Sequence, residues 1–224
     1  MTRTQKVVLS WSSGKDSAWA LHVLRQRPDT EVVGLLTTLN TEFDRVTMHA
    51  VRRELVRAQA GMANLGLIEV ELPWPCSNET YEERMSGALE ACAARGAEAV
   101  AFGDLFLEDV RSYREERMRG SGLDVLFPLW GLDTRALSRE MVSSGLRAIV
   151  TCVDPKQVDA SIVGREYDAA LLDALPDAID PCGERGEFHS FVHAGPMFES
   201  PLPVRCGEVV ERDGFVFADV LMAD

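Results

Sequence analysis

A short run of small, hydroxyl-bearing and charged residues stands near the start of the chain, Ser10-Trp11-Ser12-Ser13-Gly14-Lys15-Asp16-Ser17. It separates a strand-like apolar run from a segment with helical periodicity, which predicts a turn between a first strand and a first helix. Such a turn exposes backbone N–H groups, and the helix that follows adds unpaired N–H groups and the positive end of its dipole. These residues therefore predict an anion site suited to nucleotide phosphates.

The side chains of this phosphate loop (residues 10–17) suit the same ligand. The serine hydroxyls can donate hydrogen bonds, and Lys15 supplies a cation. An acidic residue is an odd neighbour for a polyphosphate unless it caps the helix or holds Mg²⁺ through water, and Asp16 can do either. A capped helix start with no ligand is the other interpretation of these residues.

Two familiar phosphate-binding motifs do not fit the phosphate loop. A Walker A motif requires G-x-x-x-x-G-K-[ST], whereas Gly14-Lys15 is followed by Asp16 and has no glycine five residues before Gly14. The dinucleotide fingerprint G-x-G-x-x-G is absent as well. The loop therefore belongs to a different class of nucleotide site.

Apolar runs alternate with amphipathic segments over the first two thirds of the chain. The predicted strands are Lys6–Trp11, Glu31–Thr38, Leu67–Leu72, Ala97–Gly103, Val125–Phe127 and Arg147–Cys152. Helices are predicted over 16–27, 48–65, 79–95 (with Ser77 or Asn78 as N-cap), 113–119 and 134–144. Short apolar strands alternating with helices predict an α/β fold, a parallel, doubly wound, Rossmann-like sheet covered on both faces.

The rhythm changes after Asp154. A helix is predicted over 165–175, a loop leads into an alternating strand over 180–193, and Asp213-Gly214 between two apolar runs predicts a β-hairpin. We expect a nucleotide-binding domain over residues 1–150, whose last strand is Arg147–Cys152. Residues 151–224 are expected to form a small C-terminal α+β part that carries the hairpin and binds the substrate.

Composition limits the partners and the compartment. Lys and Arg total 23 against 36 Asp and Glu, and the net charge of −13 disfavours nucleic acid as a partner. Five scattered cysteines without a C-x-x-C pair favour a reducing, cytoplasmic compartment. No secretory signal and no apolar stretch near the roughly 20 residues of a membrane span is found, so no membrane partner is expected.

The phosphate loop resembles the S-G-G-x-D-S loop of the PP-loop ATP pyrophosphatase superfamily, which implies an adenine nucleotide α hydrolase-like fold. Within the superfamily the chain is most similar to the diphthine–ammonia ligase family, and the similar segments follow the same order over nearly the whole chain. They are Ser12–Ser17, Met48-His49, Gly103-Asp104, Pro128-Leu129-Trp130, Pro181-Cys182-Gly183-Glu184 with Gly186-Glu187, and Gly195-Pro196-Met197-Phe198.

The resemblance has departures in both halves. Ser13 replaces the usual second glycine of the phosphate loop, which is conservative for an anion site because serine adds a donor. In the C-terminal motif Arg185 stands where the family tends to have glycine, and Phe188 and His189 stand for tyrosine and glutamate. Since this segment is expected to face the second substrate, the acceptor is expected to differ too.

The resemblance implies ATP-dependent amidation. A substrate carboxylate attacks the α-phosphorus, pyrophosphate leaves, and ammonia displaces AMP from the acyl-adenylate. The implied partners are ATP, Mg²⁺, ammonia or ammonium, and a carboxylate-bearing acceptor that is a protein or a small metabolite. The sequence leaves a homodimer open.

The resemblance also implies roles for individual residues. The catalytic set is Lys15, Asp16, Glu184 and Glu187, with Asp16 also as the metal ligand. The ATP-binding set is Ser10, Ser12, Ser13, Gly14, Lys15, Asp16, Ser17, Thr37, Gly103 and Asp104, with Thr37-Thr38 beside the adenine. The substrate set is His49, Gly183, Glu184, Gly186, Glu187 and His189.

Several side chains have alternative interpretations. His189 and His193 lie roughly 13 Å apart on one face of a strand, too far to share a metal ion, so no zinc site is expected. His49 is equally a substrate ligand and a cap or packing residue. Trp11 and Trp19 are expected in the core rather than against a base.

Two further functions stay open. Cys76 and Cys182 allow a PP-loop enzyme that thiolates RNA, although the acidity of the chain weakens it and such cysteines are often small buried hydrophobes. A non-catalytic ATP-binding sensor on a similar sheet is the third function. It would leave Glu184 and Glu187 without a task, unless they belong to a solvated acidic loop.

Overall fold

The first sheet of the protein is mostly parallel. The computed structural model describes residues 3–46 and 50–223, and its sheet order is β3-β2-β1-β5-β6, with β4 beside β2. The strands are β1 (Gln5–Ser10), β2 (Thr30–Asn40), β3 (Arg45–Val46), β4 (Leu67–Leu72), β5 (Ala99–Ala101) and β6 (Asp124–Leu126). All pairings are parallel except that of the two-residue β3, which the sequence did not predict. The predicted parallel α/β fold is confirmed.

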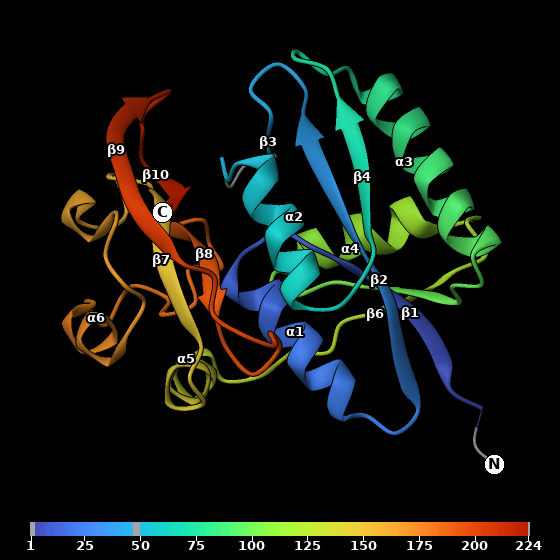
Figure 1. Ribbon diagram of the computed structural model, residues 1–224, viewed down its shortest axis with the longest axis horizontal. Coiled ribbons are helices and arrows are strands. Elements are labelled where there is room, and N and C mark those ends of the chain that lie inside the picture. Colours follow the sequence, from blue (N-terminus) through green and yellow to red (C-terminus); the bar gives the residue numbers. More distant parts are fainter. Residues whose placement is uncertain (1–2, 47–49, 224) are drawn as a thin grey trace.

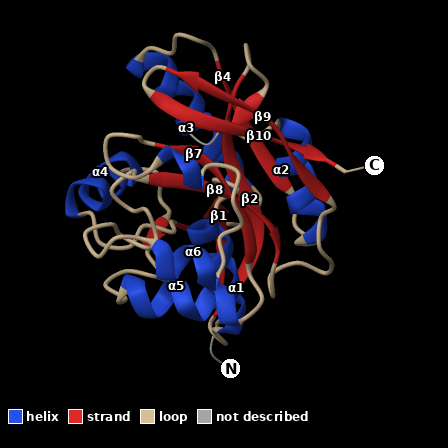
Figure 2. Ribbon diagram, turned by 90° about the vertical axis from the view of Figure 1, so that its left-hand side faces the viewer, coloured by secondary structure: helices blue, strands red, loops and turns tan. Residues whose placement is uncertain are grey.

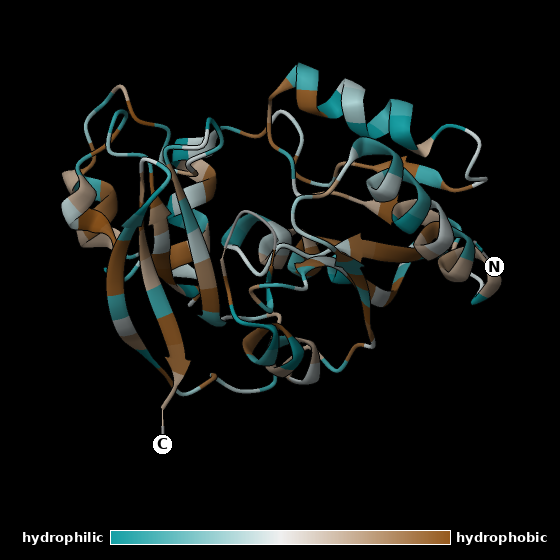
Figure 3. Cartoon of the chain, turned by 90° about the horizontal axis from the view of Figure 1, so that it is seen from above, coloured by the Kyte–Doolittle hydropathy of each residue, from teal (hydrophilic) through white to brown (hydrophobic). Residues whose placement is uncertain are grey.

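Helices cover both faces of this sheet (Figure 1). They are α1 (Lys15–Gln26), α2 (Arg53–Met62), α3 (Asn78–Ala94) and α4 (Glu108–Met118). Side chains alternate across a strand, so Val7 and Leu9 pack with α1 and α2, whereas Val8 packs with α3 and α4. The strands are accordingly mostly hydrophobic along their length, and α3 turns hydrophilic residues outward (Figure 3).

A second, antiparallel sheet follows, with order β8-β7-β10-β9. Its strands are β7 (Arg147–Val153), β8 (Phe188–Ala194), β9 (Val204–Arg212) and β10 (Phe215–Met222). The hairpin predicted from Asp213-Gly214 is confirmed, because both residues take the positive φ values, 51° and 82°, that such a turn requires. The helices α5 (Thr134–Ser143) and α6 (Ala169–Ala174) accompany this sheet.

One strand was predicted in the wrong sheet. Residues 147–152 do form a strand, but β7 pairs antiparallel with β8 and β10 and does not join the parallel sheet. A continuous apolar run fits any strand buried on both faces, so its composition could not distinguish the two sheets. We infer that the division between the two parts lies between β6 and α5 rather than at residue 150.

The two sheets share a hydrophobic core that runs from β1 and α1 into β7 and β8. Trp11 and Trp19 are each only 1% exposed within it, which confirms their predicted core role. Figure 2 shows the β9–β10 hairpin at the same end of the molecule as β4 and far from the N-terminus, in agreement with Figure 1. The carboxyl edge of the parallel sheet is therefore bordered by the second sheet.

The local predictions are confirmed in type and differ at element ends. Ser77 is the N-cap of α3 and accepts a hydrogen bond from the Thr80 N–H at 3.1 Å. The helix predicted over 48–65 is shorter, because it ends before Asn64, whose positive φ of 53° breaks the helical path. Among residues 3–46 and 50–223, no helix is long and apolar enough to cross a membrane.

Candidate active site

The phosphate loop leaves the carboxyl edge of β1 beside β2. Ser10 is the last residue of β1, and the Trp11 N–H donates to the Leu36 carbonyl at 2.7 Å. Ser13 then takes a left-handed conformation with φ of 72°, and Gly14 is the N-cap of α1. Gly14 has no side chain to cap the helix, and Ser190 Oγ on β8 accepts the first helical N–H, that of Lys15, at 3.3 Å. The N-terminus of α1 therefore presents its N–H groups at the edge where ligands of parallel α/β sheets bind.

Three buried polar atoms at this edge have no hydrogen-bond partner within the described residues. They are the Ser13 hydroxyl, the Thr37 hydroxyl and Oδ1 of Asp16. Thr37 follows directly on Leu36, which pairs with Ser10. Native structures seldom leave such atoms unpaired, and a bound ligand or ion is one regular explanation. All three residues belong to the ATP-binding set predicted from the sequence.

Other polar groups of the phosphate loop pair with one another. The Ser12 and Ser17 hydroxyls lie 3.1 Å apart, and Ser17 Oγ also donates to the Gly14 carbonyl at 3.0 Å. The Gly14 N–H points to Ser12 Oγ at 3.3 Å. These contacts hold the turn in shape and leave Ser13 and Asp16 to face a ligand.

Lys15 points into the protein rather than along the loop surface. It is only 2% exposed, and its ammonium group donates to Asp16 Oδ2 at 2.9 Å and to the Cys182 carbonyl. The rings of Tyr167 and Phe188 lie 5.7 and 5.4 Å from the Nζ atom. Burial lowers the pKa of Lys15, but Asp16, Cys182 and Asp180 together outweigh it, and the net pKa is raised. Lys15 therefore stays charged and ties the phosphate loop to the segment around Cys182.

Gln59 is a site residue that the sequence analysis missed. Its fully buried side chain donates to the carbonyls of Ser13 at 3.0 Å and Val192 at 2.6 Å, and accepts from the Trp11 indole at 2.9 Å. Val192 in turn donates its N–H to the Ser13 carbonyl at 3.0 Å. A single glutamine on the apolar face of α2 was the available signal, since a buried polar side chain needs partners.

The loop over residues 180–187 is organised by Glu187. This carboxylate is 2% exposed and accepts the backbone N–H groups of Asp180 at 3.2 Å and Arg185 at 2.9 Å. Gly183 and Gly186 supply the positive φ values that the loop requires, and a Cβ atom on Gly183 would lie 2.7 Å from the Phe188 carbonyl oxygen. The geometry gives Glu187 a structural task, and its catalytic role stays a prediction.

Glu184 lies over the end of β5. Its Oε1 atom accepts the Leu105 N–H at 2.8 Å, and its own N–H donates to Asp180 Oδ2 at 2.9 Å. Burial raises the pKa of Glu184 to about 7, and the nearby Asp16 and Asp104 carboxylates act in the same direction. A carboxyl group that titrates near neutrality suits acid–base chemistry.

Gly103 and Asp104 complete this side of the site. A Cβ atom on Gly103 would lie 2.9 Å from the Asp16 carbonyl carbon, so only glycine lets β5 approach the first turn of α1 this closely. Burial raises the pKa of Asp104, although Arg114 lies within 3.4 Å of its carboxylate. The Gly103-Asp104 motif thus combines a glycine that packs closely against α1 with a carboxylate at the carboxyl edge of the parallel sheet.

Two family profiles together cover most of the chain. The diphthamide synthase N-terminal domain matches residues 5–125, and the diphthamide synthase C-terminal domain matches residues 133–218. The chain belongs to the diphthamide synthase family. The recognition made from the sequence motifs is confirmed.

Individual relatives are distant. Argininosuccinate synthase of Rhodococcoides fascians is 27% identical over 78% of this chain and 49% of its own length. The diphthine–ammonia ligases of Schizosaccharomyces pombe and Mus musculus are 32% and 29% identical over 51% and 55% of this chain, and over 20% and 48% of theirs. The chain thus spans about half, or less, of the curated relatives it matches.

Among solved structures, the U34-tRNA thiolase NcsA from Methanococcus maripaludis aligns with a TM-score of 0.37 and 14% identity, covering 58% of this chain and 54% of that one. The likeness is slight. The fold of this diphthamide synthase family member is established by its own strand order.

The remaining predicted residues are distributed as follows. His49 lies outside the described residues. His189 is on β8 next to Ser190, whose Oγ accepts the Lys15 N–H at 3.3 Å. Burial and the charge of Lys15 lower the pKa of His189 to about 4, so this histidine is neutral.

Burial raises the pKa of the Cys182 thiol strongly, which makes it a poor nucleophile.

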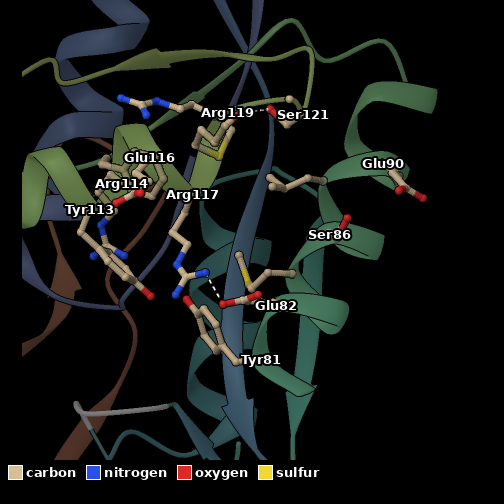
Figure 4. A pocket seen from close by; sticks show the side chains of 15 residues that line it. Tyr81, Glu82, Ser86, Glu90, Tyr113, Arg114, Glu116, Arg117, Arg119 and Ser121 are labelled. Carbon is tan, nitrogen blue, oxygen red and sulfur yellow. Dashed lines mark hydrogen bonds and ion pairs between the residues drawn. The ribbon is translucent and has the colours of Figure 1, made fainter. Parts of the chain in front are cut away.

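Other possible sites among the described residues are groups of metal ligands and cavities away from the phosphate loop. No group of three or more His, Cys, Asp and Glu side chains arranged to hold a metal occurs within the described part of the chain. A cavity of about 590 Å³ lies between α3 and α4, lined by Tyr81, Tyr113, Arg117 and neighbours, with Arg117 paired to Glu82 (Figure 4). No phosphate-loop residue lines it.

The close approach at Gly103 yields a prediction about nucleotide affinity. Replacing Gly103 by alanine should displace the first turn of α1, lower the affinity for ATP by tenfold or more, and destabilise the fold by about 1–3 kcal/mol. Calorimetric titration with ATP and thermal unfolding measure both effects.

Gly87→Ala is the matched control, because Gly87 lies inside α3 with nothing within 4 Å of a new Cβ atom. Alanine there should stabilise the helix by roughly 0.5–1 kcal/mol and leave ATP affinity unchanged. Equal ATP affinity of the two variants would contradict the account of Gly103.

Proposed function

We propose that this diphthamide synthase family member is an ATP-dependent amide ligase. It joins ammonia to a carboxylate through an acyl-adenylate and releases AMP and pyrophosphate. The observation that carries the proposal is the set of unpaired buried atoms on Ser13, Asp16 and Thr37, at the strand edge from which α1 begins. Those atoms and the helix N-terminus are polar groups that need partners, which a nucleotide and its metal ion would supply.

The nucleotide is proposed to lie across the ends of β1, β2 and β5. The N–H groups of the phosphate loop and the dipole of α1 stabilise the phosphates, and the Ser13 hydroxyl donates to them. The Thr37 hydroxyl meets the nucleoside on the β2 side. Gly103 lets the end of β5 approach the first turn of α1, so the three strand ends border one binding site.

Mg²⁺ is proposed to arrive with ATP rather than to reside in the protein. It usually keeps several waters and binds through one or two carboxylates together with substrate phosphates. Oδ1 of Asp16, buried and unpaired, fits that role, and Asp104 is the neighbouring carboxylate. When bound, the ion neutralises charge that develops on the departing pyrophosphate.

Glu184 is proposed to serve the ammonia step. Its carboxylate lies with those of Asp16 and Asp104, and three acidic groups favour ammonium over an anion at this point. In its ionised form Glu184 accepts the proton that ammonium loses before its nitrogen attacks the acyl carbon. The Leu105 N–H holds one carboxylate oxygen in place and leaves the other to accept the proton.

The two other functions have less support. The RNA thiolation alternative rests on Cys76 and Cys182, but Cys182 is buried with a raised thiol pKa, and the two cysteines pack against different hydrophobic clusters. A non-catalytic sensor has no use for a buried carboxyl group whose pKa is near neutrality, as at Glu184. The acidity of the chain disfavours an RNA substrate further.

The test of the proposal is the position of ATP cleavage. Incubation with α-labelled ATP, Mg²⁺, ammonium and a cell metabolite extract should give labelled AMP, because the account places the α-phosphorus under attack. Asp16→Ala should lower AMP formation by a factor of about 100 or more, since it removes the predicted metal-binding oxygen. Chromatographic separation of AMP from ADP measures both results.

Asp173→Ala is the control for Asp16→Ala. Within the described part of the chain, Asp173 forms only an exposed ion pair with Arg139, so its loss should leave AMP formation unchanged. ADP as the labelled product would contradict the proposal outright. Unchanged AMP formation in Asp16→Ala would contradict the assignment of the phosphate loop.

The raised pKa of Glu184 predicts a pH dependence. The acid form predominates below pH 7 and the base form above it, because the pKa is about 7. The rate of amidation should therefore rise through this range in the wild type. Glu184→Gln should be slower by roughly 100-fold above pH 8, and its rate should lack the rise that comes from titration of the Glu184 carboxyl group.

Free ammonia also increases with pH, but equally for both proteins. The ratio of wild-type to Glu184→Gln rates therefore isolates the carboxyl group, and it should rise between about pH 6 and 8 and then level off. A ratio that stays constant with pH would rule out Glu184 as the base.

A further inference from the structure

A second cavity lies beside the proposed nucleotide site. Its volume is about 250 Å³, and it is bounded by the segment over 40–46, by Trp74 after β4, and by the β9–β10 hairpin. Both parts of the chain thus contribute to it. The figures place the hairpin and the end of β4 at the same end of the molecule (Figures 1 and 2).

The walls of this cavity are aromatic and partly open to solvent. Phe43, Trp74 and Phe215 are 43%, 60% and 36% exposed, and Phe217 lines the cavity with them. The Phe43 and Trp74 ring centroids are 6.3 Å apart, so the two rings border the same opening. Large aromatic side chains gathered at an opening are typical of ligand-binding sites, and their faces suit a flat ring.

A cation already occupies part of the aromatic surface. The Arg212 guanidinium lies over the rings of Phe43 and Phe217, at 5.5 and 5.7 Å from their centroids. Within the described residues it has no hydrogen bond to a carboxylate. Because the Arg212 guanidinium lies over two of the four rings, a cationic ligand would meet repulsion where aromatic faces would otherwise attract it.

The side chains that line the cavity include more arginines than carboxylates. Arg45 lines the cavity and shares the Asp219 carboxylate with Arg52, at 2.8 and 2.6 Å. Asp213 is the carboxylate among the lining residues, next to Arg212. Two guanidinium groups and one carboxylate therefore line the cavity, and only Arg45 of the two arginines is paired with a carboxylate within the described residues. The lining itself thus favours an anionic occupant.

The cavity lies next to the nucleotide rather than in its place. Asn40 lines it and stands three residues beyond Thr37, about 10 Å further along β2. His189 also lines it, and the adjacent Ser190 contacts the Lys15 N–H. The phosphate loop and Gly103 lie over β1 and β5, whereas the cavity lies beyond the ends of β2 and β4. The charge of Lys15 also acts on His189, so the cavity lies close to the phosphate loop.

We propose that this cavity holds the acceptor, and that the acceptor is an anionic molecule with a flat aromatic body. This inference rests on the proposed ligase function and names the substrate class of the same site. The aromatic walls stack on the ring, and Arg212 attracts the negative charge. The neutral His189, at the position that the family resemblance gives to glutamate, removes a negative charge that would repel such an acceptor.

Equilibrium dialysis with three matched probes tests the inference without any turnover. The probes are 4-nitrobenzoate, the neutral 4-nitrobenzamide and the cationic (4-nitrobenzyl)trimethylammonium. The carboxylate should bind about tenfold or more tightly than the amide, because a charge-assisted contact to Arg212 adds to the stacking. Arg212→Gln should abolish that difference.

Arg205→Gln, an exposed position on the same strand that does not line the cavity, should leave it unchanged. In the wild type, ATP should not displace the carboxylate. A carboxylate that binds no more tightly than the amide, or less tightly than the cation, would overturn the inference. Displacement by ATP would do so too, since the cavity would then be the adenine pocket. None of these results depends on AMP formation, so failure here is distinct from failure of the ligase proposal.

Discussion

The position of the Ser13 carbonyl is the constraint on which the site depends. It accepts hydrogen bonds from Gln59 on α2 and from the Val192 N–H on β8, at 3.0 Å each, while the Lys15 ammonium group binds the Cys182 carbonyl. These contacts hold the phosphate loop from both parts of the chain. Because Ser13 has a positive φ of 72°, a strained conformation for serine, the loop needs such external support.

This support decides which groups are left for a ligand. The Ser13 carbonyl is engaged, whereas its buried hydroxyl is left unpaired within the described residues, as are the buried atoms of Asp16 and Thr37 at the same edge of the sheet. The Lys15 ammonium group is already bound to the Cys182 carbonyl of the C-terminal part. The phosphates would therefore be bound by backbone N–H groups and by the α1 dipole. The same contact brings Glu184 over β5, where burial raises its pKa toward neutrality. The contact that holds the phosphate loop therefore also positions Glu184.

The sequence predicted the parallel sheet, the phosphate loop, the hairpin at Asp213-Gly214 and the family, because these depend on local periodicity, small residues and turn chemistry. It did not predict that 147–152 joins the second sheet, since strand pairing is decided by tertiary packing. It also missed Gln59, whose task is visible only once Ser13 and Val192 are adjacent. Glu187 is the opposite case to Gln59. Its motif was recognised, yet its burial against backbone N–H groups indicates a structural role.

The most direct measurement is backbone hydrogen exchange with and without the α,β-methylene analogue of ATP, which cannot be cleaved between those phosphates. We expect amides over 12–17 and 180–187 to gain protection together, because Lys15 links the two segments. The segment around Tyr113 and Arg117, at the cavity between α3 and α4, should be unaffected. Protection confined to that cavity, or to residues 12–17 without 180–187, would contradict the claim that both parts of the chain form one nucleotide site.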